Sequence, residues 1–212
     1  MTIASLWIDS QTLNLQTNLT AIMENLFLVC LVPPTSIVED VDEIRNYIAD
    51  EFKVYESLKR PAHITLYNPV KIASEEMEKR FFYALSTAAF SIPFVQVLQN
   101  FSSFPQHTFF LDVEKNPGIM DLQSQIKKAL APLDLRTEQQ KFNPHLTLAF
   151  KDVKQPVFDA IIKTFKDRKF KRTFTVSGFS VYKHIDKKWR PYKEFPFRNP
   201  QDNPETRDLF SI

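Results

Sequence analysis

The chain has 212 residues, a length that fits one domain or two closely packed halves. The numbers of basic and acidic side chains, 27 and 25, are too nearly equal for a dedicated DNA-binding surface. They still allow a local basic pocket for a small anion. The chain contains only two glycines, Gly118 and Gly178, which excludes a P-loop and a glycine-rich dinucleotide fingerprint. If the protein holds a phosphate, side chains must therefore do most of the holding.

Cys30 is the only cysteine, so the sequence excludes an internal disulfide and a cysteine-rich zinc site. It lies in an apolar run, which is typical of a small core residue in a reducing compartment. No apolar stretch approaches the roughly 20 residues that a membrane span needs, and the first 22 residues do not read as a secretory signal. We therefore expect a cytoplasmic protein, a monomer, with no membrane contact.

In chain order, residues 1–22 are polar and weakly patterned, and we expect a loosely attached N-terminal extension. The pattern then alternates between strands and helices. The apolar spacing predicts a strand at 26–32, a helix at 36–50, a strand at 62–67, a helix at 74–90 and a strand at 94–101. Pro33 and Pro34 mark the first turn, and Ser36 is the expected start signal of the first helix.

A shift of 82 positions superposes the second half of the chain on the first. Residues 59–66, KRPAHITL, fall on residues 141–148, KFNPHLTL, and the lysine, histidine, threonine and final leucine coincide. The same shift places the strand at 26–32 on 108–114 and the helical segment at 38–49 on 120–131. The second half is predicted to hold a strand at 108–114, a helix at 118–131 started by Asp121, a strand at 144–150, a helix at 156–167, and a strand at 174–183 that pairs with 189–197.

This repeat predicts an α+β fold built from two pseudo-symmetric lobes around a central groove. We expect each lobe to be a small, mainly antiparallel sheet with two helices. The duplicated domain spans 23–197, with lobes at about 23–103 and 104–197, and residues 198–212 form a tail.

The two His-x-Thr-x segments of the repeat are the strongest candidates for chemistry. On a strand, alternate side chains share a face, so His63 and Thr65 point one way while Ile64 and Leu66 point into the core. The same holds for His145 and Thr147. If the repeat is a twofold in space, the two polar faces oppose each other and place two imidazoles and two hydroxyls around one small volume.

Such a set suits phosphoester cleavage without a metal. One group must take a proton from the attacking oxygen and another must give a proton to the leaving oxygen, and histidine does either near neutral pH. The hydroxyls of Thr65 and Thr147 can donate hydrogen bonds to the non-bridging phosphate oxygens, where transition-state charge develops. Which histidine, His63 or His145, starts as the base is left open by the sequence.

With both motifs, His63-Ile64-Thr65-Leu66 and His145-Leu146-Thr147-Leu148, the chain resembles the two-histidine (2H) phosphoesterase superfamily over about residues 24–197. That superfamily includes bacterial 2′-5′ RNA ligase-like proteins and cyclic nucleotide phosphodiesterases. The resemblance implies a bilobal α+β fold with the motifs lining a groove. It also implies metal-independent chemistry on 2′,3′-cyclic phosphates or 2′-5′ linkages of RNA-like or nucleotide substrates, with no cofactor, and it does not decide between hydrolysis and ligation.

Three alternatives remain at this point. The same groove could bind a nucleotide or an RNA end without turnover, the histidines could serve a metal-dependent hydrolase, or the fold could be a scaffold with no ligand. No carboxylate lies beside both His-x-Thr segments, which disfavours a metal site because zinc takes three or four close ligands.

Several other residues have weaker claims to a role. Tyr67 shares the face of His63 and could stack on a base or sugar, although its counterpart is Ala149 and it could equally be a half-exposed strand aromatic. We expect no catalytic role for His107 or His184. Phe104 lies in the loop that we expect at 102–107, and a solvated hairpin is the favoured interpretation of the basic cluster formed by Lys183, Lys187, Lys188 and Arg190.

Overall fold

The computed structural model describes residues 25–105, 107–135 and 141–202, and the predicted extension 1–22 and residues 203–212 of the tail lie outside these ranges. Its strands are β1 (Asn25–Leu31), β2 (Ile64–Ile72), β3 (Phe94–Phe104), β4 (Thr108–Val113), β5 (His145–Ala149), β6 (Lys171–Val176), β7 (Gly178–Ile185) and β8 (Lys188–Pro196). Its α-helices are α1 (Thr35–Phe52), α2 (Glu75–Ala88), α3 (Pro117–Leu130) and α4 (Gln155–Phe165). The predicted α+β class and the predicted pairing of β7 with β8 are confirmed.

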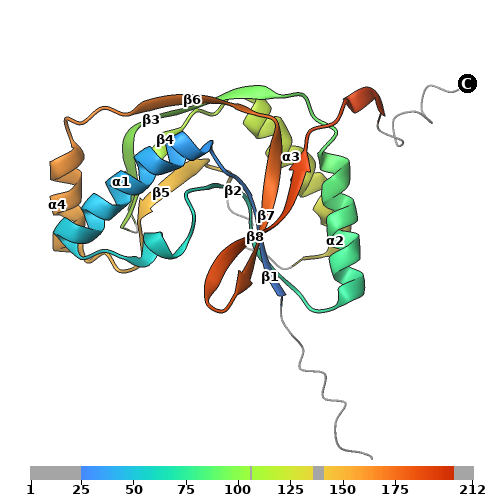
Figure 1. Cartoon of the computed structure of the whole chain (residues 1–212), viewed down its shortest axis with the longest axis horizontal. Coiled ribbons are helices and arrows are strands. Elements are labelled where there is room, and N and C mark those ends of the chain that lie inside the picture. Colours follow the sequence, from blue (N-terminus) through green and yellow to red (C-terminus); the bar gives the residue numbers. More distant parts are fainter. Residues whose placement is uncertain (1–24, 106, 136–140, 203–212) are drawn as a thin grey trace, which may run out of the picture.

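The strands form one curled, eight-stranded sheet rather than the two small sheets that the sequence predicts (Figure 1). Its order is β6-β3-β4-β5-β2-β1-β7-β8, and neighbouring strands are antiparallel. The two halves join where Ile64 of β2 pairs with Leu146 of β5. This junction pairs two strands that would otherwise be open sheet edges, which is the physical reason for a single sheet.

The sheet is pseudo-symmetric about the β2–β5 junction, and each half combines strands from both repeats. Strand β3 belongs to the first repeat but pairs with β4 and β6, while β7 belongs to the second repeat and pairs with β1. The helices are exchanged in the same way, because α1 contacts β5 and α3 contacts β2. Figure 1 accordingly shows α1 with α4 at one end of the molecule and α2 with α3 at the other. The sequence division at residues 103 and 104 does not anticipate this exchange.

The repeat also contains a local change of offset. Leu31 lies opposite Ile64, and Leu111 lies opposite Leu146, so the first strands of the repeats are related by 80 positions rather than 82. Helices α1 and α3 begin at Thr35 and Pro117, which preserves the offset of 82. A shift of two residues leaves every strand side chain on its original face, so the apolar pattern alone cannot reveal this change of offset.

Both predicted helix start signals are wrong. Ser36 is the second residue of α1, which begins at Thr35 after Pro34 without a side-chain cap. Helix α3 begins before Asp121, because the Asn116 side chain accepts a hydrogen bond from the Ile119 amide at 3.1 Å and Pro117 occupies the first helical position. An asparagine cap followed by proline satisfies one orphan amide and needs no donor at the next position, so it outcompetes a later aspartate.

The apolar faces that the sequence predicts for α2 and α4 are buried. Phe81 and Leu85 of α2 and Ile161 and Phe165 of α4 lie in the main core. Ile64 and Leu66 on β2, with Leu146 and Leu148 on β5, belong to the same core and anchor the two strands at the junction. The central strands therefore have one face fixed by packing, which leaves the other face to carry polar groups.

Candidate functional site

Each His-x-Thr segment presents its polar residues on one face and its aliphatic residues on the other, as the alternation predicts. His63 directly precedes β2, and the side chains of His63, Thr65 and Tyr67 are half-buried, whereas Ile64 and Leu66 are buried. His145 opens β5, and it and Thr147 are half-buried next to the buried Leu146 and Leu148. The packing of the aliphatic face therefore fixes the direction of the polar face.

The junction register brings the two segments together. Since Ile64 pairs with Leu146 in antiparallel strands, the flanking positions place Thr65 across from His145 and His63 across from Thr147. Residues directly opposite in such a pair have Cβ atoms about 5 Å apart, and diagonal neighbours such as His63 and His145 lie about 7–8 Å apart. The register thus makes the two imidazoles diagonal neighbours on one face of the sheet.

Both rings make the same hydrogen bond to the backbone. His63 Nδ1 lies 2.7 Å from the Pro61 carbonyl oxygen, and His145 Nδ1 lies 2.8 Å from the Asn143 carbonyl oxygen. A carbonyl only accepts, so Nδ1 carries the proton in both rings and Nε2 is the nitrogen with the lone pair. In the described part of the chain no hydrogen bond engages Nε2 of either ring.

The electrostatic surroundings of the two rings differ. Burial lowers the pKa of His63 to about 4; the hydrogen bond to Pro61 opposes this, and the charges of Arg60, Arg45 and His145 add to it. Because the charge of His145 acts on His63, the rings lie within electrostatic range of each other. Burial also lowers the pKa of His145, whereas the hydrogen bond to Asn143 and the carboxylate of Asp112 raise it.

Asp112 owes its effect to its place in the sheet. It pairs with His145 across β4 and β5, so Asp112, His145 and Thr65 form one row across three strands. The surroundings of His63 are cationic by comparison. The pKa of both rings is lowered, that of His63 to about 4, while Asp112 opposes the shift at His145. His145 is therefore the more readily protonated ring of the two, and a difference of this kind is what acid–base chemistry on one phosphate uses.

A cavity of about 270 Å³ opens beside this row and is lined by Thr65, Tyr67 and His145. Aromatic side chains supply part of its wall, because Phe104 and Phe142 also line it, and the Phe104 ring meets the His145 ring edge-on at 4.9 Å. Phe104 is the last residue of β3 rather than part of a loop. His63 and Thr147 are not among the lining residues of this cavity.

Sequence reasoning missed three charged residues of the site, namely Arg45, Arg60 and Asp112. Arg45 is 3% exposed, and its Nη2 donates to the Arg60 carbonyl oxygen at 2.6 Å while Nη1 bonds Asp42 at 2.8 Å. It thereby holds the turn that leads to His63. The sequence contains one indication for Arg60. At the offset of 82 it aligns with Phe142, so the first copy of the repeat has a cation where the second has an aromatic residue.

The other two histidines lie apart from the junction. His107 Nε2 lies 2.6 Å from Gln155 Oε1, and the exposed His184 ring lies 5.2 Å from the Trp189 ring on the β7–β8 hairpin. Within the described ranges, no group of three or more His, Cys, Asp or Glu side chains could hold a metal ion. None of the helices described is long and apolar enough to cross a membrane.

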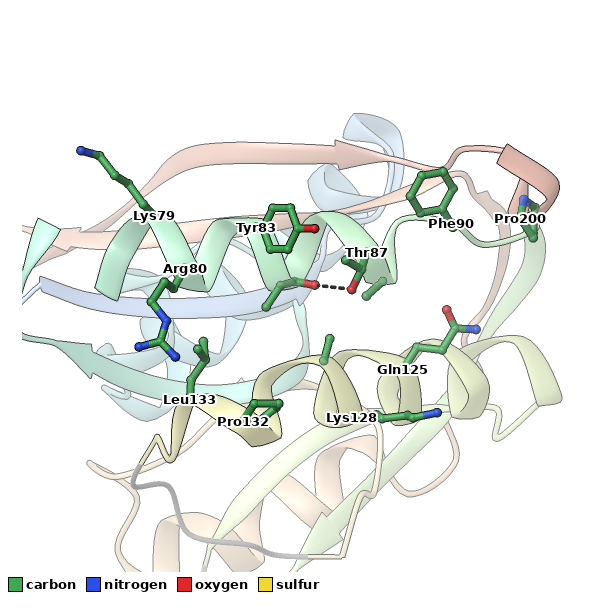
Figure 2. Close-up of a pocket in the computed structure, with 13 residues that line it drawn as sticks. Lys79, Arg80, Tyr83, Thr87, Phe90, Gln125, Lys128, Pro132, Leu133 and Pro200 are labelled. Atoms are coloured by element: carbon green, nitrogen blue, oxygen red, sulfur yellow. Dashed lines mark hydrogen bonds between the residues drawn. The ribbon is translucent and has the colours of Figure 1, made fainter. Parts of the chain in front are cut away.

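A larger cavity, of about 820 Å³, lies on a different part of the surface between α2 and α3 (Figure 2). Tyr83, Lys79 and Arg80 approach it from α2, and Gln125 and Lys128 from α3. It contains no histidine and no carboxylate, so among its lining residues there is no acid–base pair. The larger of the two cavities therefore lacks the groups that proton transfer needs.

Comparison with known proteins places the chain in a family. The model of the 2′-5′ RNA ligase superfamily matches residues 33–188. The structure is similar to E. coli LigT complexed with 3′-AMP, with a TM-score of 0.60 and 17% identity, covering 83% of this chain and 99% of that one. It is equally similar to TT0787 of Thermus thermophilus, with a TM-score of 0.60 and 18% identity, covering 82% of this chain and 98% of that one. These likenesses concern the fold, and no protein of curated function matches the sequence.

Proposed function

This chain belongs to the 2′-5′ RNA ligase superfamily, and we propose that it is a metal-independent phosphoesterase that acts on 2′,3′-cyclic phosphates or 2′-5′ linkages of RNA-like substrates. The observation that carries the proposal is the junction register, which sets His63 across from Thr147 and Thr65 across from His145. The E. coli LigT structures with 3′-AMP, ATP and phosphate support a nucleotide or phosphate ligand for this fold.

In the proposed hydrolysis, His63 is the base and His145 is the acid. His63 Nε2 takes a proton from water as the water oxygen bonds to phosphorus. His145 Nε2 gives its proton to the ribose oxygen whose bond to phosphorus breaks, so one phosphomonoester and one free hydroxyl result. The depressed pKa of His63 keeps its lone pair available, and Asp112 favours the charged form of His145. Ligation uses the same two groups with a 5′-hydroxyl in place of water: His63 takes the hydroxyl proton as its oxygen bonds to phosphorus, and His145 protonates the ribose oxygen that leaves the cyclic phosphate.

Thr65 and Thr147 hold the phosphate in this proposal. Their hydroxyls lie on the same face as the imidazoles, and β-branching keeps threonine side chains rigid on a strand. Donors that are already aimed at non-bridging oxygens stabilise the charge that develops there. Tyr67 lines the cavity next to Thr65 and is placed to contact the base or sugar of the substrate.

The test is hydrolysis of nucleoside 2′,3′-cyclic phosphates and short 2′-5′ linked RNAs with a chelator present. His63→Ala and His145→Ala should each lower kcat by about 10²–10⁴-fold, which is the usual contribution of one proton-transfer group. Binding of 3′-AMP should change only modestly. His107→Ala is the matched control, because it removes a histidine away from the junction, and it should retain full turnover.

Three results would contradict the proposal. Turnover that survives both junction substitutions would show that other groups do the chemistry. Loss of activity with chelator, restored by a divalent ion, would indicate a metal-dependent hydrolase. Binding of 3′-AMP without turnover of any substrate would indicate a non-catalytic module that binds nucleotides or RNA ends in the same groove.

A further inference from the structure

A second cleft lies at the turn that precedes His63, apart from the cavity lined by Thr65, Phe104, Phe142 and His145, which we call the aromatic cavity. It has a volume of about 480 Å³, and its lining includes Arg45, Lys59, Arg60, Pro61 and Lys188. The turn that lines it runs directly into the site, because His63 follows Arg60 by three residues, a span of at most about 10 Å in an extended chain. The carbonyl of Pro61 also accepts the His63 Nδ1 hydrogen bond.

The two clefts are copies of one another in the internal repeat. The offset of 82 positions places Arg45 on Lys127, Lys59 on Lys141 and Pro61 on Asn143, and these counterparts line the aromatic cavity. It also places Arg60 on Phe142, which lines that cavity too. The segment that precedes each histidine therefore lines one of two related clefts, and these clefts have diverged in their chemistry.

The aromatic copy suits a nucleoside, and the other copy suits an anion. Arginine and lysine side chains line the second cleft from three directions: Arg45 from α1, Lys59 and Arg60 from the segment before β2, and Lys188 from the start of β8. Asp42 is the carboxylate among its lining residues, and it bonds Arg45. The cleft thus retains an excess of positive charge, which attracts a phosphate.

Arg60 is held in place by aromatic rings rather than by a carboxylate. Its guanidinium carbon lies 5.1 Å from the centre of the Phe150 ring and 5.6 Å from the centre of the Trp189 ring. Glu56 is near enough to act on Arg60, but its carboxylate pairs with Lys59. In the described part of the chain no ion pair engages Arg60 or Lys188. A guanidinium that packs against rings in this way keeps its donors for a ligand and loses little entropy on binding one.

Arg45 adds an independent observation. It is 3% exposed, and its Nε has no hydrogen-bond partner, although both of its terminal nitrogens are bonded. Asp42 offsets the charge of Arg45, but the Nε–H remains a buried donor without a partner, and such a donor costs free energy unless an acceptor reaches it.

We propose that the cleft lined by Arg45, Arg60 and Lys188 binds a second phosphate of the substrate, next to the phosphate held between His63 and His145. The proposal rests on the proposed function and deepens it by naming the substrate class. The preferred substrates are then nucleotides or RNA ends that carry two neighbouring phosphoryl groups, with the nucleoside in the aromatic cavity. A mononucleotide with a single cyclic phosphate leaves the cationic cleft empty.

The experiment compares two ligands that differ only in the second phosphate, adenosine 3′-monophosphate and adenosine 3′,5′-bisphosphate. Calorimetric titration at low salt should show the bisphosphate binding at least about tenfold more tightly, and this advantage should shrink as salt rises. Lys188→Ala and Arg60→Gln should each reduce the advantage to under about threefold. Lys188→Ala should leave the affinity for the monophosphate unchanged, which excludes a folding defect as the cause.

Lys163→Ala is the matched control, because Lys163 is an exposed lysine of α4 and does not line the cleft. Equal affinities of the wild type for the two ligands would overturn the proposal. The proposal would also be overturned if the tighter binding of the bisphosphate survived both cleft substitutions. It would be overturned as well if Lys163→Ala reduced the tighter binding to the same extent, because the overall electrostatic potential of the protein would then be its source. Binding is measured separately from turnover, so a missing cyclic-phosphate activity would overturn the proposed function alone.

Discussion

Acid should destabilise the folded protein through His63 in particular. Burial lowers the pKa of His63 to about 4, whereas the same ring in the unfolded chain titrates near its ordinary value of 6.5. Between these values the unfolded chain binds a proton that the folded chain does not bind, so stability falls as the pH decreases from about 6.5 to 4. The difference between these two pKa values corresponds to a loss of about 3 kcal/mol in the free energy of unfolding. This is a large part of the 5–15 kcal/mol by which a typical domain is stable.

The assay is urea unfolding of the wild type and of His63→Asn at pH 7 and pH 4. Asparagine removes the titrating ring but keeps an amide donor for the Pro61 carbonyl. The acid-induced loss of unfolding free energy should be smaller in the variant by about 3 kcal/mol, because every other titrating group cancels in the comparison. His107→Asn should retain the loss seen in the wild type. Identical losses in the wild type and His63→Asn would refute the reasoning.

Three further predictions concern other parts of the molecule. Asp112→Asn removes the charge that raises the pKa of His145, so the fall of kcat/KM on the alkaline side should move to lower pH, and an unmoved profile would exclude Asp112 as a positioning residue. Asn116→Ala removes the cap of α3 and should cost about 1–2 kcal/mol in urea unfolding, while no loss would show that Pro117 alone sets the helix start. Gly118→Ala places a Cβ 2.3 Å from the Phe94 ring and should lower stability by about 1–3 kcal/mol, whereas an unchanged melting temperature would contradict that packing.

The sequence is sufficient to predict the two strands that carry the His-x-Thr segments. Alternation at Ile64 and Leu66, and again at Leu146 and Leu148, is set by burial of one strand face, which is a local property that the residue pattern reports. The α2 and α4 helices follow from the same logic, because their apolar spacing matches one buried face. The direction in which His63 points is therefore predictable without any tertiary information.

The arrangement of the strands is not predictable in the same way. The pairing of β3 with β4 and of β7 with β1 depends on which sheet edges meet, and the residues of a strand do not encode its neighbour. The two-residue change of offset between β1 and β4 cannot be read from the alternation of apolar residues, because each side chain stays on the same face of the sheet. Asp112 was missed for this reason, since only the correct register places it beside His145.

The most direct test of the central claim, that both imidazoles contact one phosphate, is an NMR titration of the ring nitrogens with adenosine 3′-monophosphate. The Nε2 resonances of His63 and His145 should shift together, with one dissociation constant and a stoichiometry of one ligand per chain, while His107 and His184 stay unmoved. A shift of only one of the two rings, or two different dissociation constants, would contradict the account.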